Sequence, residues 1–133
     1  MDQTLATAKY ISFATFKRDG TPVSSPVWVA TADGQLVFTT GAKTWKVRRL
    51  SHNPRVVVEV CDARGRVASE STKWPGSASV LSSPDDVARA EAIMAAKYGW
   101  QYRASQRYFG LRARLRGDRR EVVAIQIALE IDG

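Results

Sequence analysis

The sequence predicts a mainly β protein, in which six strands close into a small barrel accompanied by a few helices. Short stretches rich in β-branched and aromatic residues recur along the first eighty or so positions, and turn signals of Gly, Pro and Asp separate them. A last stretch alternates between strongly apolar and mixed positions. Six short strands in 133 residues favour a closed sheet, because closure removes the unpaired edges.

The first three predicted strands follow one another closely, over residues 10–17, 22–31 and 35–40. An Asp-Gly pair between the first two is a hairpin signal. Pro22 and Pro26 have no N–H to give to a ladder, so part of the second strand should lie at a sheet edge or carry a bulge.

Gly41 ends the third strand, and residues 43–51 have the spacing of a short basic helix. A fourth strand is expected over residues 55–63 and a fifth over residues 77–82. The stretch between them contains Pro75-Gly76, which predicts a turn.

A helical excursion precedes the last strand. Ser83-Pro84-Asp85-Asp86 offers a cap, a proline at the first helical position and acids against the helix dipole, and Gly99 closes this helix. Residues 100–116 are basic and aromatic and should be helical at their beginning. The sixth strand is expected from residue 122 to residue 131.

The composition favours one cytoplasmic domain over residues 1–133. Hydrophobic residues make up 44% and charged residues 25%, and we expect no membrane span and no signal peptide. The single Cys61 excludes an intrachain disulfide and is expected in the core. His52, the one histidine, should lie in a solvated loop. One histidine and one cysteine are too few for a Cys/His zinc site.

A basic stretch follows the third strand. The net charge of +7 favours an acidic partner, whether nucleic acid, anionic membrane or phosphorylated ligand. On a helix, Lys43, Lys46 and Arg49 share a face, and no carboxylate occurs between Asp33 and Glu59. Such a face either binds a phosphate or is simply solvated. The glycine spacings of a P-loop and of a dinucleotide-binding turn are both absent.

Four segments together resemble a known family: DGTPVSSPVW, LVFTTGAKTWKVRRL, NPRVVVEVCDARGR and KYGW. The sequence resembles the pyridoxamine-phosphate-oxidase-like split β-barrels, and within them the actinobacterial branch that uses the deazaflavin coenzyme F420. The resemblance implies a homodimer with cofactor sites at the interface. It also implies hydride transfer between F420 and a small conjugated or quinone-like substrate.

The resemblance implies two groups of cofactor-binding residues. The second strand would run along the ring system with Val23, Ser24, Ser25, Pro26 and Val27. The third strand's end and the basic helix would hold the phosphate with Thr39, Thr40, Thr44, Lys46 and Arg49. No catalytic residue or proton donor is assigned, because the cofactor carries the reaction.

Two alternatives remain at this stage. The chain could bind flavin mononucleotide (FMN), as an oxidase or as a flavin or haem binder. A nucleic-acid module is less favoured, because the aromatic residues are scattered rather than grouped. Arginines between residues 103 and 120 would suit the polyglutamate tail of F420 or form a solvated surface. The aromatic residues Trp28, Trp100, Tyr102, Tyr108 and Phe109 could border the site or simply pack.

Overall fold

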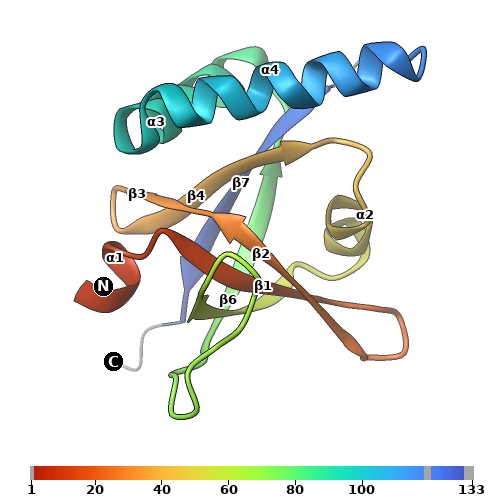
Figure 1. Ribbon diagram of the computed structural model, residues 1–133. Coiled ribbons are helices and arrows are strands. Elements are labelled where there is room, and N and C mark those ends of the chain that lie inside the picture. Colours follow the sequence, from red (N-terminus) through yellow and green to blue (C-terminus); the bar gives the residue numbers. More distant parts are fainter. Residues whose placement is uncertain (1, 119–120, 131–133) are drawn as a thin grey trace.

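The computed structural model describes residues 2–118 and 121–130 (Figure 1). Within them, seven antiparallel strands form one curled sheet in the order β2-β1-β5-β6-β7-β4-β3. The strands are β1 (Tyr10–Phe16), β2 (Pro22–Trp28), β3 (Ala30–Ala32), β4 (Gln35–Gly41), β5 (Arg55–Cys61), β6 (Trp74–Leu81) and β7 (Val122–Leu129). The helices are α1 (Gln3–Ala6), α2 (Trp45–His52), α3 (Pro84–Tyr98) and α4 (Trp100–Leu115). The mainly β prediction is confirmed.

Val29 joins the two end strands of the curled sheet. Strands β2 and β3 stand at opposite ends of the sheet order, yet Val29 alone separates them in the chain. Residues 22–31 were predicted as one strand, and this is wrong, because the segment pairs first with β1 and then, after bending, with β4. Val29 is fully buried and its N–H donates to the Tyr98 hydroxyl. The prolines do lie in an end strand, β2, as expected.

The core fills the inside of the curled sheet. The rings of Phe13 on β1 and Phe38 on β4 meet edge to face at 5.0 Å, although three strands separate β1 from β4 in the sheet. Leu36, Ile125 and Ile127 are fully buried beside them. Burial of such side chains removes apolar surface from water and supplies most of the driving force for folding.

Helices α3 and α4 form a layer on one side of the barrel (Figure 1). The predicted start of α3 is confirmed, since the Asp86 N–H donates to Ser83 Oγ. Helix α4 continues to Leu115, so the expectation of helix only at the beginning of this segment is wrong. Tyr102 and Ala113 are both buried, and a spacing of eleven residues puts them on one face about three turns apart. Burial of this face stabilises the helical conformation as far as Leu115.

Two other elements begin at a different residue from the predicted one, and β5 ends at Cys61 rather than at residue 63. Helix α2 begins at Trp45 because Thr44 is extended and serves as its N-cap. Strand β6 begins at Trp74, because Pro75-Gly76 lies within the sheet rather than in a turn. A Cβ on Gly76 would lie 2.8 Å from the Ala128 carbonyl oxygen, so this glycine permits close approach of β7. No helix in the described residues is long and apolar enough to cross a membrane.

Candidate functional site

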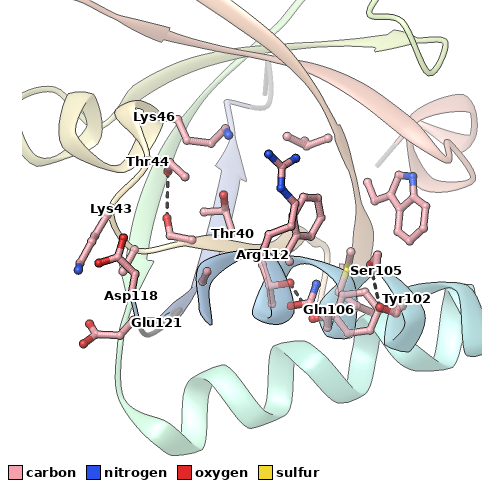
Figure 2. A pocket seen from close by; sticks show the side chains of 18 of the residues that line it. Thr40, Lys43, Thr44, Lys46, Tyr102, Ser105, Gln106, Arg112, Asp118 and Glu121 are labelled. Carbon is pink, nitrogen blue, oxygen red and sulfur yellow. Dashed lines mark hydrogen bonds between the residues drawn. The ribbon is translucent and has the colours of Figure 1, made fainter. Parts of the chain in front are cut away.

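A pocket of about 780 Å³ opens between the barrel and α4 (Figure 2). Its walls come from the start of β1, the end of β2, the turn from β4 into α2, the inward face of α4, and the connection between α4 and β7, with Met94 of α3 beside them. This volume is typical of sites for cofactors and small molecules, which span roughly 300–1,000 Å³.

The turn from β4 into α2 supplies hydroxyl and ammonium groups to one end of the pocket (Figure 2). Thr40, Lys43, Thr44 and Lys46 all line it. The Thr44 hydroxyl donates to the Gly41 carbonyl at 3.0 Å and does not cap α2. The first N–H groups of α2 therefore keep their capacity to donate to an anion.

Lys46 is half-buried in this wall. Burial lowers the pKa of its ammonium group below the usual value, and the neighbouring Arg49 lowers that pKa further. Arg49 does not line the pocket; its Nε donates to Oγ1 of the fully buried Thr15 at 2.7 Å. The pocket therefore contains a partly desolvated cation that an anionic ligand would stabilise.

Strand β2 contributes only its end. Pro26 and Val27 line the pocket together with Trp28, whereas Val23, Ser24 and Ser25 lie further back along the strand and do not. Trp28 stacks on Tyr98 with ring centroids 4.8 Å apart and meets Tyr10 edge to face. These rings fix the indole at the rim of the pocket.

Helix α4 provides a wall of the pocket. None of the residues predicted to bind the cofactor's ring or its phosphate lies on this helix. Tyr102, Ser105, Gln106 and Phe109 line the pocket from one helix face. The Tyr102 hydroxyl lies 2.7 Å from Thr39 Oγ1 and so joins α4 to β4. Tyr102 therefore both packs and lines the site. Helical spacing within residues 100–116 would have found this wall if the whole segment had been predicted as helix.

The arginines of this segment divide between the pocket and the surface. Arg112 and Arg116 line the pocket (Figure 2 labels Arg112). Arg103, Arg107 and Arg114 are exposed, as the solvated-surface interpretation expected, and are absent from the pocket lining. The remaining predicted members, Arg119 and Arg120, lie outside the described residues.

Two carboxylates also line the pocket. Asp118 and Glu121 come from the connection between α4 and β7, and the Ala42 N–H donates to the Glu121 carbonyl at 2.8 Å. Four cationic side chains line the same pocket: Lys43, Lys46, Arg112 and Arg116. In the part of the chain that the structure describes, the ion pairs join Arg66 to Asp62 and Arg89 to Asp33, away from this site. The pocket is thus net positive.

The other candidate groups lie elsewhere. His52 is exposed at the end of α2, within 3.1 Å of Arg18. Cys61 was expected in the core but is only half-buried, and burial raises the pKa of its thiol, which disfavours the thiolate form. Among the described residues, no group of His, Cys, Asp and Glu could hold a metal ion.

Comparison with known structures places this fold among split barrels. A conserved hypothetical protein, Rv2991 from Mycobacterium tuberculosis, is 19% identical with a TM-score of 0.70, over 98% of this chain and 82% of that one. An F420 reductase is 18% identical with a TM-score of 0.62, over 97% and 93%. HutZ, a haem storage protein from Vibrio cholerae, is 14% identical with a TM-score of 0.67, over 94% and 84%.

At these identities the likeness concerns the fold, and one fold can carry different cofactors. Comparison with curated protein sequences gives no match. The sequence model of the family described as pyridoxamine 5'-phosphate oxidase matches residues 1–127. The chain belongs to the pyridoxamine 5'-phosphate oxidase family, as its sequence segments and its curled antiparallel sheet both indicate.

Proposed function

We propose that this protein is an oxidoreductase that binds coenzyme F420 in the pocket between the barrel and α4. The substrate would be a small conjugated or quinone-like molecule. One observation carries the proposal: the pocket has a phosphate-suited end on α2 and two further arginines, Arg112 in the last turn of α4 and Arg116 at its C-cap. F420 carries a phosphate and a tail of several carboxylates, so it needs cations in both places.

The residues present fit such a group. Lys46, the hydroxyls of Thr40 and Thr44, and the first N–H groups of α2 are the donors that a phosphate requires. Arg112 and Arg116 would meet the tail carboxylates. Val27 and Trp28 offer an apolar wall to a ring system. When bound, the deazaflavin supplies the hydride chemistry, and the chain supplies binding, orientation and charge.

FMN is the alternative cofactor. It has one phosphate, which the same end of the pocket would accept, but it leaves Arg112 and Arg116 without an anionic partner. Haem is less well supported, since the described lining of the pocket contains neither the histidine nor the cysteine that commonly serves as its axial ligand.

A homodimer would complete the site. Strand β2 has a neighbour on one side only, and Val23, Ser24 and Ser25 lie outside the pocket of a single chain. A second copy placed along β2 would bring these residues to a shared interface, in agreement with the roles that the family resemblance implies. The cofactor-binding roles of all the predicted site residues remain predictions, including those of Val23, Ser24, Ser25 and Arg49, which lie outside the pocket.

Cofactor titration tests the proposal. Oxidised F420, reduced F420 and FMN are each added to the purified protein, and binding is followed by the change in their fluorescence. We expect saturable binding of F420 and weaker binding of FMN. A protein that purifies with a flavin spectrum and does not respond to F420 would contradict the proposal.

Replacing Arg112 by glutamine should weaken F420 binding more than FMN binding. Loss of one exposed charge pair is worth up to about 1 kcal/mol, or about fivefold in the dissociation constant. FMN, which lacks the carboxylate tail, should change by less than about twofold. Arg107→Gln is the matched control, because Arg107 is exposed on α4 and absent from the pocket lining. Equal loss for both cofactors would mean that Arg112 does not contact the tail.

A further inference from the structure

Helix α4 carries an exposed apolar stripe on the face turned away from the barrel. Its members, which we call the α4 stripe, are Trp100, Ala104, Tyr108, Leu111 and Leu115. Spacings of four, four, three and four residues align them along one side of the helix. Trp100 is 76% exposed, Leu111 57% and Leu115 79%.

The stripe is not needed to hold α4 in place. The helix attaches to the barrel through the opposite face, where Tyr102 and Ala113 are buried and the Tyr102 hydroxyl contacts Thr39. Large apolar side chains gathered on a surface mark a contact with something else.

Arginines flank the stripe. Arg103, Arg107 and Arg114 project along one side of it, as their helical positions require. No carboxylate occurs between Glu91 and Asp118, so nothing within α4 neutralises this charge. An apolar line bordered by cations is typical of helices that lie in the surface of an anionic bilayer.

Other occupants fit less well. Two copies packed stripe to stripe would oppose the arginines of one helix to those of the other, without a carboxylate from either helix. A nucleic acid would satisfy the arginines but would leave Leu111 and Leu115 without an apolar partner. An anionic lipid surface offers negative charge to the arginines and an apolar interior to the leucines. Tryptophan and tyrosine favour the headgroup level of such a surface.

We propose that the α4 stripe docks this protein onto an anionic membrane surface. The 16 residues of α4 would lie along the bilayer for about 24 Å, with the leucines at the acyl boundary and the arginines at the headgroups. Because the other face of α4 lines the pocket, docking brings the pocket within about one helix diameter, roughly 10 Å, of the lipid. Docking itself does not depend on the proposed cofactor.

Vesicle co-sedimentation with the full chain tests the proposal. Vesicles of phosphatidylcholine alone are compared with vesicles that also contain phosphatidylglycerol. We expect binding to the anionic vesicles and little to the neutral ones. Leu111→Ser with Leu115→Ser should lower the partition coefficient at least about tenfold. Arg107→Gln with Arg114→Gln should lower it about tenfold or more.

Matched controls come from the loop between β5 and β6, at the opposite end of the molecule from α4 (Figure 1). Arg64→Gln with Lys73→Gln removes the same charge there, and Val67→Ser removes an exposed apolar side chain. Both variants should bind vesicles as the wild type does. Three results would overturn the proposal: no binding to anionic vesicles, leucine variants that bind like the wild type, or a dimer that dissociates when the leucines are replaced.

Discussion

Replacing Lys46 by methionine should weaken cofactor binding by about 1.5–3 kcal/mol, the worth of a hydrogen bond to a charged group. The same change should stabilise the ligand-free protein by about 0.5–2 kcal/mol. Both effects have one cause. Burial and the adjacent Arg49 destabilise the charged form of Lys46 in the ligand-free protein, and a bound anion would stabilise it. Fluorescence titration measures the first effect and urea denaturation the second.

Lys43→Met is the matched control for Lys46. Lys43 lines the same pocket but is exposed, so its replacement should leave the free energy of unfolding within about 0.5 kcal/mol of the wild type. Unchanged cofactor affinity in Lys46→Met would mean that the phosphate lies elsewhere. A less stable ligand-free Lys46→Met protein would mean that the ammonium group has a structural partner.

The pH dependence of binding follows from the same lysine. Its pKa in the free protein is lowered, so the ammonium group loses its proton at a pH below the usual value of 10.5. A phosphate favours the charged form, and cofactor affinity should therefore fall as the pH rises through that lowered pKa. Lys46→Arg should bind without this alkaline loss, because arginine stays protonated.

Replacing Tyr98 by phenylalanine should destabilise the fold by about 1–3 kcal/mol, the cost of leaving a buried donor unsatisfied. The Tyr98 hydroxyl accepts the N–H of Val29, at the junction of β2 and β3, and lies 2.8 Å from the Lys9 carbonyl oxygen. Phenylalanine keeps the ring that stacks on Trp28 but provides no partner for the Val29 N–H. Urea denaturation at neutral pH measures the change.

Tyr98 also predicts an alkaline limit to stability. Burial raises the pKa of Tyr98 to about 12 from its usual 10. The folded state therefore favours the neutral phenol, and this contribution is complete below pH 10 and lost as the pH rises toward 12. Tyr98→Phe should remove that alkaline loss, whereas Tyr108→Phe, at an exposed position, should retain it. Equal stability of Tyr98→Phe and wild type would show that Val29 does not depend on this hydroxyl.

Local signals in the sequence predicted much of the fold. Stretches rich in β-branched and aromatic residues predicted most of the strands, and Ser83-Pro84 predicted the start of α3, because both signals depend on nearby residues. The bend at Val29 was not predictable in this way, since it depends on pairing first with β1 and then with β4, which three strands separate in the sheet. Gly76 resembled a turn residue, yet its role depends on how closely β7 approaches.

Only some of the residues that line the pocket were predicted from the sequence, because the others meet only through contacts that are distant in the chain. The structure brings Thr40, Thr44 and Lys46 into one pocket with Val27, although β2 and α2 are separated in the chain. The contributions of α4 and of Asp118 and Glu121 were missed, because they reach the pocket only through the packing of the helical layer. The family resemblance implies cofactor contacts from Val23, Ser24 and Ser25 on β2, but these residues do not line the pocket of a single chain.

A crystal structure of the protein with F420 tests the central claim most directly. We expect a phosphate oxygen at about 3 Å, a hydrogen-bond distance, from Lys46 Nζ, with the start of α2 facing the same phosphate. The carboxylate tail should run toward Arg112. A cofactor phosphate bound away from α2, with Lys46 in contact only with water, would contradict this assignment of the pocket.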